Sequence, residues 1–246
     1  MNSFKLMITF FTRIPVKKVH FSEEQWTKGI KYTPFVGVII GGILCLVGFL
    51  LHHLIHQDVL SLLMLLLYIG ITGGLHLDGL SDTSDGIFSN RSKERILEIM
   101  KDSRIGAFGV ISLILLIIGY FVMFTHGTIL ILFLFPIIGR TVAIITCRVS
   151  GYAREEGMGK VFIEHAKKND AFNLVLFTSL LVIVSLLYFK QWEIVISILL
   201  TYFISIWITK RISKKIDGIT GDVIGFMIEI SQIIFLFLTY VGGQFH

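Results

Sequence analysis

Charged residues and proline are scarce in this sequence. Of its 246 residues, 16% are charged and three are proline, whereas 54% are hydrophobic; a soluble domain averages about 25% charged and about 45–50% apolar residues. The apolar residues lie in long blocks, such as 35–51 and 171–189, rather than as scattered core positions. The composition therefore excludes a water-soluble globule and predicts a polytopic membrane protein.

Cysteine is nearly absent as well. Cys45 and Cys147 both lie in or at the end of apolar blocks, which favours two small buried hydrophobic residues over a disulfide or a metal-binding pair. A cleavable signal peptide is not expected, because the opening apolar run at residues 4–11 is short, contains Lys5 and lacks a small-residue cleavage site.

Seven apolar segments approach the length of about 20 residues that a helix needs to cross the bilayer core. They cover residues 34–54, 58–75, 106–124, 128–147, 172–189, 193–209 and 223–242. Long apolar blocks with few charges are typical of transmembrane helices. We therefore expect an all-α fold in which residues 1–246 form a single membrane domain, a bundle of about seven transmembrane helices.

Positive charge is concentrated in alternate connections between these segments; Lys190 is the one Lys or Arg residue in the other connections. Twenty of the 22 Lys and Arg residues lie in four stretches: 1–33, 76–105, 148–171 and 210–222. Because short cytoplasmic loops retain positive charge, this pattern places the N-terminus and the three loops in the cytoplasm and the C-terminus outside. The net charge of +5 is then explained by orientation and by attraction to anionic membrane lipid. We expect no nucleic-acid partner, and we expect residues 1–33 to form an amphipathic segment on the cytoplasmic face.

The most polar region spans residues 73–109 and reads GGLHLDGLSDTSDGIFSNRSKERILEIMKDSRIGAFG. Its first acidic residues, Asp78, Asp82 and Asp85, stand at i, i+4 and i+7, so they share one face if the second span continues as a helix. No Lys or Arg occurs within residues 73–90 to offset their repulsion. Oxygen ligands clustered without counter-charge favour a hard cation such as Mg²⁺; a solvated acidic face is the alternative.

Basic residues near this acidic cluster predict a site that handles phosphate. Seven of them follow it or come from the fourth span and the loop after it: Arg91, Arg95, Lys101, Arg104, Arg140, Arg148 and Arg154. Arginine suits bidentate contacts to phosphate oxygens. For Arg91, Arg95 and Lys101, retention of positive charge in a cytoplasmic loop is an equally good explanation.

Three further polar residues stand close to or within apolar segments. His76, two positions before Asp78, is a general base, a substrate-binding group or an interfacial histidine, and the sequence leaves these roles open. Arg140 lies about seven residues inside the fourth span and Glu229 about six residues inside the seventh, counted from the cytoplasmic side. Because ionisable groups inside a membrane tend to pair, we expect an Arg140–Glu229 pair.

A short acidic motif occurs twice. Asp78-Gly-Leu-Ser-Asp82 in the first large loop resembles Asp217-Gly-Ile-Thr-Gly-Asp222 in the last. Two matches this short do not establish an internal duplication. They do show that carboxylates recur at the predicted cytoplasmic ends of helices.

The string GGLHLDGLSDTSDG, followed by LEIMKDSRIGAFGV, is the most distinctive motif of the chain. Shorter motifs extend along nearly the whole sequence: FFTRIP at 10–15, PFVGVIIGG at 34–42, Gly139-Arg140, YAREEGMG at 152–159 and GITGDVIG at 218–225. With these motifs the sequence resembles the cobalamin synthase family, the membrane-bound adenosylcobinamide-GDP ribazoletransferases. Ser81 and Ser84 stand where the family often has alanine.

The resemblance implies a Mg²⁺-dependent enzyme of the last stages of vitamin B12 assembly, in the cytoplasmic membrane of a prokaryote. It would join adenosylcobinamide-GDP to α-ribazole, or to α-ribazole 5′-phosphate, with release of GMP and formation of adenosylcobalamin or its 5′-phosphate. Such a transfer requires that charge on a pyrophosphate is neutralised and that the attacking ribose hydroxyl is held in line. The active site would face the cytoplasm.

This chemistry implies roles for residues in the motifs. Asp78, Asp82 and Asp85 would hold Mg²⁺, and Asp222 would complete the coordination or accept the hydroxyl proton. The catalytic candidates are Asp82, His76 and Asp102. The candidates for binding phosphate are Lys101, Arg104, Arg140, Arg154 and Lys160.

Two other classes are less consistent with the residues. CDP-alcohol phosphotransferases, which act on lipid, also use aspartates and Mg²⁺ at a helix end, but their pattern begins D-G-x-x-A-R, and here Asp78-Gly79 leads to Asp82 without Ala-Arg. Transporters tend to place ionisable residues near the bilayer midplane, whereas these carboxylates gather at one face. Whether the chain forms a homo-oligomer stays open, since close helix contacts within or between chains are equally compatible with Gly37, Gly41, Gly42 and Gly48.

Overall fold

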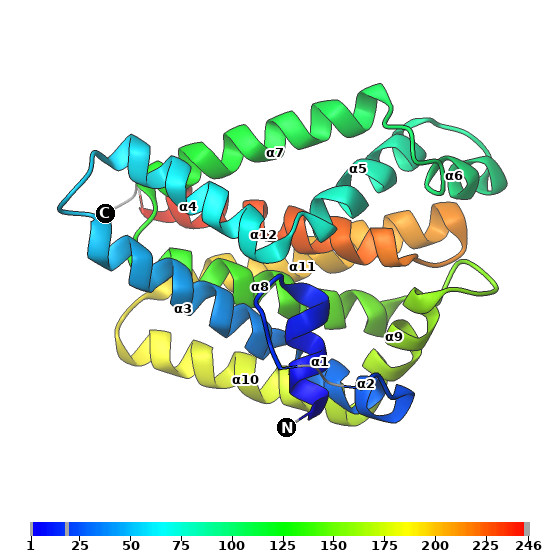
Figure 1. Cartoon of the computed structure of the whole chain (residues 1–246), viewed down its shortest axis with the longest axis horizontal. Coiled ribbons are helices and arrows are strands. Elements are labelled where there is room, and N and C mark those ends of the chain that lie inside the picture. Colours follow the sequence, from blue (N-terminus) through cyan, green and yellow to red (C-terminus); the bar gives the residue numbers. More distant parts are fainter. Residues whose placement is uncertain (1, 18–19, 244–246) are drawn as a thin grey trace.

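The computed structural model describes residues 2–17 and 20–243, and this part of the chain is built from helices (Figure 1). They are α1 (Asn2–Phe11), α2 (Glu23–Gly29), the 3-10 helix η1 (Ile30–Tyr32), α3 (Thr33–Leu51), α4 (Gln57–Thr72), α5 (Leu75–Phe88), α6 (Lys93–Ile99), α7 (Ala107–His126), α8 (Ile129–Val149), α9 (Met158–Ala166), α10 (Asn169–Tyr188), α11 (Trp192–Ile216) and α12 (Gly221–Gly243). The strand-like pairing found in these residues is an isolated parallel bridge between Tyr152 and Ile219. The predicted all-α fold is confirmed.

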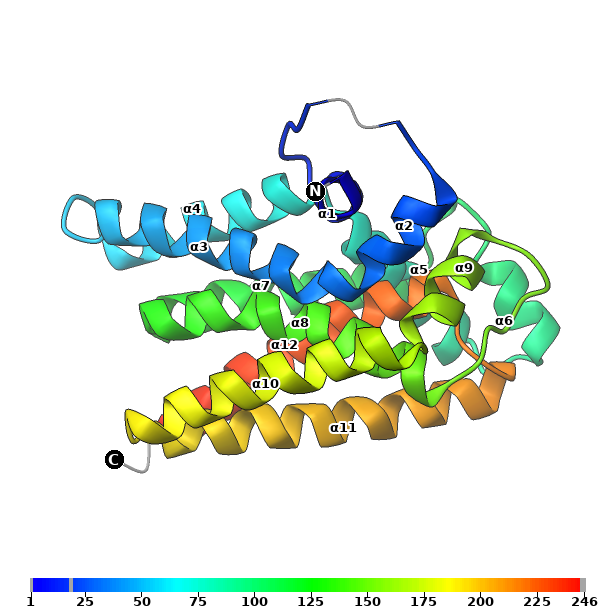
Figure 2. The ribbon, with the colours of Figure 1, turned by 90° about the horizontal axis from the view of Figure 1, so that it is seen from below.

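Seven long helices form a bundle: α3, α4, α7, α8, α10, α11 and α12 (Figures 1 and 2). Six segments of the described chain are long and apolar enough to cross a membrane, and the first of them, Glu23–Leu51, includes α2 and α3. With 16 residues, α4 meets this criterion only together with α5, from which it is bent by 89°. The chain is therefore a multi-pass membrane bundle with six spans, or with seven if the bent pair counts as one.

The bend between α4 and α5 occurs at two consecutive glycines. Gly73 has a φ of 64° and Gly74 a φ of 71°, a left-handed conformation that glycine adopts without the steric penalty of other residues. Arg13 packs against Gly73, where a Cβ atom would collide with the arginine side chain. The second span therefore does not continue as a straight helix into the acidic motif. The three aspartates of the motif lie together on the separate helix α5.

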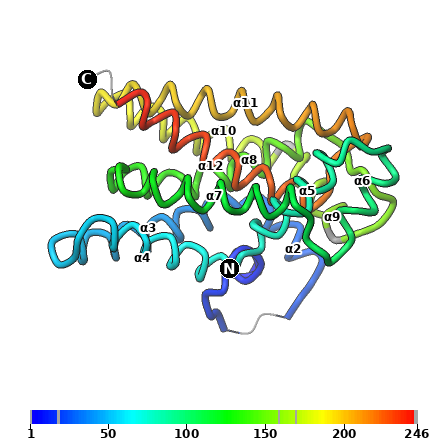
Figure 3. Tube along the Cα trace, turned by 90° about the horizontal axis from the view of Figure 1, so that it is seen from above, coloured from blue at the N-terminus to red at the C-terminus, as the bar shows by residue number. Residues whose placement is uncertain are grey.

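The Lys- and Arg-rich segments 76–105, 148–171 and 210–222 lie at one end of the bundle, whereas α1 lies beside its middle (Figure 3). Figure 3 shows α2, α5, α6, α9 and the end of α11 at this end, whereas the α3–α4, α7–α8 and α10–α11 connections lie at the opposite end. Alternate connections thus share an end, as the charge pattern requires. The assignment of this end to the cytoplasm stays a prediction. Much of the loop predicted at 76–105 is helical, and α11 extends into the one predicted at 210–222.

Small residues bring α3 and α8 into close contact. A Cβ atom on Gly37 would lie 2.6 Å from the carbonyl oxygen of Pro136, and one on Gly41 would collide with the backbone of Phe133. Gly42, in contrast, has open space around it. Gly37 and Gly41 therefore serve packing within the chain.

Glycines also allow α5 and α12 to cross closely. A Cβ atom on Gly79 would lie 2.7 Å from the carbonyl oxygen of Asp222, and one on Gly225 would lie 3.3 Å from the Cα atom of His76. Both glycines are buried. Larger residues here would force the two helices apart. The crossing therefore brings together the two similar acidic motifs, which are far apart in the sequence.

Candidate active site

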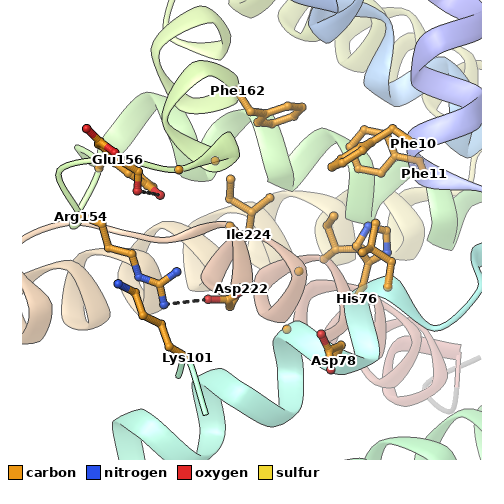
Figure 4. A pocket seen from close by; sticks show the side chains of 18 of the residues that line it. Phe10, Phe11, His76, Asp78, Lys101, Arg154, Glu156, Phe162, Asp222 and Ile224 are labelled. Carbon is orange, nitrogen blue, oxygen red and sulfur yellow. Dashed lines mark hydrogen bonds and ion pairs between the residues drawn. The ribbon is translucent and has the colours of Figure 1, made fainter. Parts of the chain in front are cut away.

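A cavity of about 440 Å³ opens at the Lys- and Arg-rich end of the bundle (Figure 4). Residues of α1, α2, α5, α9 and the first turns of α12 line it, together with the loop before α9. Its charged lining residues are Asp78, Lys101, Arg154, Glu156 and Asp222. The volume lies in the range of about 300–1,000 Å³ that is typical of small-molecule sites.

Two of the predicted metal ligands, Asp78 and Asp222, line this cavity from the first turns of α5 and α12. Asp82, one helical turn after Asp78, is half-buried and lies within electrostatic range of both. α5 contains no Lys or Arg, so the helix has no permanent positive charge to balance its three carboxylates. The acidic motifs DGLSD and DGITGD thus contribute to one acidic cluster.

Arg154 reaches this cluster because its loop pairs with the segment that precedes α12. The N–H of Ala153 donates to the carbonyl of Ile219 at 2.9 Å, and the N–H of Ile219 donates to the carbonyl of Gly151 at 2.8 Å. Nη2 of Arg154 then lies 3.2 Å from Oδ2 of Asp222. Its Nε is buried and has no hydrogen-bond partner among the described residues. The guanidinium is therefore held at the cavity by Asp222.

Asp85, the third predicted ligand from the acidic motif, is bound by the protein itself. One of its carboxylate oxygens accepts a hydrogen bond from the N–H of Gly106 at 2.7 Å, and the other from the N–H of Gly109 at 2.9 Å. Both glycines lie at the start of α7, where the first N–H groups have no partner within the helix. Asp85 is buried and is not one of the cavity-lining residues. Its contacts are those of a helix cap.

Lys101 lines the cavity, but Asp102 and Arg104 pair with each other at the surface. Arg104 donates to Asp102 through Nη2 at 2.7 Å and through its backbone N–H at 3.0 Å. These hydrogen bonds lower the pKa of Asp102 to about 2, which makes its carboxylate a weak base. The Lys160 ammonium donates to the carbonyl oxygen of Glu155 at 3.0 Å. Neither Arg104 nor Lys160 is among the described residues that line the cavity.

The carboxylates of the acidic cluster fit Mg²⁺ only if a ligand and water supply the remaining donors. In the described part of the chain, no group of three His, Cys, Asp or Glu side chains is arranged to hold a metal ion. Mg²⁺, however, usually binds one or two carboxylates together with substrate phosphates and water. Asp78 and Asp222, which both line an open cavity, match that donor set.

Behind the cavity, His76 adjoins a buried polar cluster. Its Nδ1 lies 3.7 Å from Oε1 of Glu229, and neither ring nitrogen has a hydrogen-bond partner among the described residues. Glu229 accepts hydrogen bonds from the hydroxyl groups of Tyr68 at 2.9 Å and Tyr120 at 2.7 Å. All four residues are at most 3% exposed. The carboxylate is therefore stabilised by donors from other helices rather than by solvent.

Gln232 links Arg140 to Glu229, so the two residues expected to pair interact through an amide. Nη1 of Arg140 donates to Oε1 of Gln232 at 2.9 Å, and Nε2 of Gln232 donates to Oε2 of Glu229 at 3.4 Å. An amide can stand between the two charges because it offers an acceptor to one and a donor to the other. Arg140 is fully buried and is not one of the cavity-lining residues. The structure thus places it in the core and not at the cavity.

Comparison with known proteins identifies the family. The model of the family described as cobalamin-5-phosphate synthase matches residues 3–240. The chain belongs to this family. It is 43% identical to the adenosylcobinamide-GDP ribazoletransferase of Alkaliphilus oremlandii over 242 residues, which cover 98% of each chain. Proteins of the same name from Clostridium acetobutylicum and Fusobacterium nucleatum are 41% and 35% identical, and the matches cover 96% and 100% of this chain and 94% and 99% of theirs. No solved structure matches the chain.

Membership of the cobalamin-5-phosphate synthase family confirms the resemblance carried by the motifs and the prediction of an enzyme. It overturns the alternatives of a CDP-alcohol phosphotransferase and a transporter. Several of the motifs contribute to the cavity: FFTRIP provides Phe10 and Phe11, the central motif Asp78, YAREEGMG Arg154, and GITGDVIG Asp222.

For some residues of the cavity and of the buried cluster, the sequence predicts no function. Phe10 and Phe11 belong to the segment expected on the cytoplasmic face, and FFTRIP is the signal that could have linked them to the site. Tyr68 and Gln232 stand inside apolar helices, where polar residues tend to be paired or functional. No motif points to Trp26.

Gly79→Ala is expected to separate α5 from α12 and to lower both stability and enzymatic activity. The added methyl group has no room against the α12 backbone, and overpacking of this kind costs about 1–3 kcal/mol. Denaturant unfolding should show the lower stability, and kcat should fall about tenfold or more because the acidic residues move apart. Gly42→Ala, which adds its methyl group to open space, is the matched control. Equal losses of stability and of kcat in both variants would mean that the close crossing of α5 and α12 is not what the activity depends on.

Proposed function

We propose that this chain transfers the cobinamide phosphoryl group of adenosylcobinamide-GDP to a ribose hydroxyl of α-ribazole or α-ribazole 5′-phosphate. The ribose oxygen bonds to the cobinamide phosphorus, the bond from this phosphorus to the GMP phosphate breaks, and the hydroxyl proton passes to a base. The products are GMP and adenosylcobalamin or its 5′-phosphate. The observation that carries the proposal is the meeting of Asp78, Asp222, Arg154 and Lys101 on one cavity of small-molecule size, because phosphoryl transfer depends on positioning and charge stabilisation.

In this proposal the charged side of the cavity binds the pyrophosphate. Arg154, which lies 3.2 Å from Asp222, and Lys101 offer donors to the phosphate oxygens. Asp78, Asp82 and Asp222 would hold Mg²⁺, which supplies positive charge to the pyrophosphate and to the departing GMP. The absence of Lys and Arg from α5 supports a cation as the partner of these carboxylates.

In this proposal His76 is the base. It lines the cavity two residues before Asp78, and its ring nitrogens have no hydrogen-bond partner within the described residues. Glu229, at 3.7 Å from Nδ1, would stabilise the imidazolium that forms. Of the other candidates, Asp102 already accepts hydrogen bonds from Arg104, and Asp82 and Asp222 would hold Mg²⁺ in this proposal.

We also propose that the protein lies in the cytoplasmic membrane of a prokaryotic cell and that the cavity faces the cytoplasm. Residues of α5, α9 and the start of α12 line the cavity, and the Lys- and Arg-rich segments that include α6, α9 and the end of α11 lie at the same end of the bundle (Figure 3). Positively charged segments of this kind are retained on the cytoplasmic side. Water-soluble substrates would then enter from the cytoplasm.

Measurement of GMP release by the purified protein in detergent or liposomes tests this proposal. With adenosylcobinamide-GDP and α-ribazole, we expect GMP and a corrinoid product in equal amounts, and we expect both to be lost when a chelator removes Mg²⁺ and to return when Mg²⁺ is restored. GMP release that does not require α-ribazole would indicate hydrolysis instead of transfer. No release by folded protein would refute the proposed reaction.

A further inference from the structure

The cavity has two sides of different chemistry. In Figure 4, Phe10, Phe11 and Phe162 lie on one side, and Arg154, Lys101 and Asp222 on the other. Phe10 and Phe11 come from α1, Trp26 from α2 and Phe162 from α9, and all four line the cavity. A small molecule in the cavity would therefore meet rings at one end and charges at the other.

The rings on the aromatic side support one another. The ring centroids of Phe10 and Trp26 are 4.8 Å apart, those of Phe10 and Phe11 4.9 Å, and those of Phe11 and Phe162 6.0 Å. Phe11 and Phe162 are buried, whereas Phe10 keeps 37% of its surface exposed. The inner rings thus hold an outer ring in a fixed position beside open space. Such a wall can bind the face of a planar heterocycle, as stacking on aromatic side chains binds the bases of nucleic acids.

The proposed reaction involves two bases, and the lining distinguishes between them. Guanine has N–H groups and a carbonyl on its edge, and these lose free energy on burial unless partners replace water. The benzimidazole ring of ribazole has no N–H or carbonyl. Near the rings, Figure 4 shows His76, with Asp78 beyond it, whereas Arg154, Lys101 and Asp222 lie on the other side. An apolar aromatic wall suits the benzimidazole.

We propose that Phe10, Phe11, Trp26 and Phe162 form the binding site for the benzimidazole base of the ribazole substrate. The inference rests on the proposed function. With its base against the rings, the nucleoside directs its ribose toward His76 and Asp78, which line the cavity between the aromatic and the charged side. The corrinoid nucleotide then presents its pyrophosphate at Arg154 and Lys101, while its macrocycle lies outside the cavity.

Substitutions of the two accessible rings test this assignment on the full-length protein in detergent. In Phe10→Ala and Trp26→Ala, the KM for α-ribazole and its Kd from equilibrium dialysis should each rise about tenfold, as expected for loss of a stacking partner. The KM for adenosylcobinamide-GDP should change less than about twofold. Phe10→Tyr, which keeps the ring, should restore binding. Phe21→Ala is the matched control, because Phe21 also contacts Trp26 but is 71% exposed and does not line the cavity.

The constants for the two substrates show which base lies against the rings. A rise in the KM for adenosylcobinamide-GDP with unchanged binding of α-ribazole would place guanine against the rings and overturn it, as would unchanged constants for both substrates. Wild-type protein that binds no α-ribazole would also overturn it. Dialysis separates this inference from the proposed function: α-ribazole binding that depends on Phe10 and Trp26 would support the site even if no GMP were released.

Discussion

Asp82→Asn is expected to abolish transfer while leaving the protein at least as stable as the wild type. Asp82 is half-buried on α5 and lies within electrostatic range of Asp78, Asp85 and Asp222. Neutralising it removes repulsion between like charges, so the free energy of unfolding should stay constant or rise. The same change removes a carboxylate from the proposed Mg²⁺ site. We expect kcat to fall on the order of a thousandfold, equivalent to about 4 kcal/mol of transition-state stabilisation.

Asp85→Asn is the matched control, because it makes the same change one turn further along α5. Its carboxylate caps α7 through the N–H groups of Gly106 and Gly109, and an amide has a single acceptor oxygen for the two donors. We expect a stability loss of about 0.5–2 kcal/mol and a kcat within about tenfold of the wild type. Activity at saturating Mg²⁺ and denaturant unfolding should be measured on both variants. Near wild-type turnover of Asp82→Asn would refute its proposed role.

The general plan of the fold can be predicted because hydropathy and charge act over whole segments. The spans expected at 106–124 and 128–147 coincide with α7 and α8 to within a few residues, and the Lys- and Arg-rich segments gather at one end of the bundle (Figure 3). The bend at Gly73 and Gly74 is different, because consecutive glycines permit a left-handed turn without requiring one. Packing of Arg13 against this turn is a tertiary contact that no local pattern predicts.

At the site, residue types are easier to predict than their partners. Asp78 and Asp85 are equivalent members of one motif, but the start of α7 provides N–H donors to Asp85. Which aspartate remains available to a ligand therefore depends on a helix that begins more than twenty residues later in the sequence. The position of Gln232 between two buried charges depends in turn on the rotation of α12. Hydropathy does not determine that rotation for a helix that is apolar on most sides.

The buried cluster behind the cavity predicts a large stability loss. Arg140→Met should lower the free energy of unfolding by about 3–5 kcal/mol, because it leaves the charge of Glu229 buried without a compensating cation. Arg140 is fully buried and Glu229 is also buried, so solvent cannot replace the missing charge. Denaturant unfolding in detergent measures the loss. A loss below about 1 kcal/mol would mean that Glu229 is satisfied by Tyr68, Tyr120 and Gln232 alone.

A double-mutant cycle with Glu229→Gln separates charge coupling from packing. If Gln232 transmits the interaction, the double variant should be less destabilised than the sum of the two single variants by about 0.5–3 kcal/mol, because neither charge is then left alone. Additive losses would mean that Arg140 contributes packing only.

Glu229 also lies 3.7 Å from His76, which lines the cavity. Glu229→Gln should therefore lower kcat and leave both KM values unchanged, since it removes the charge that stabilises the proposed imidazolium without removing a contact to substrate.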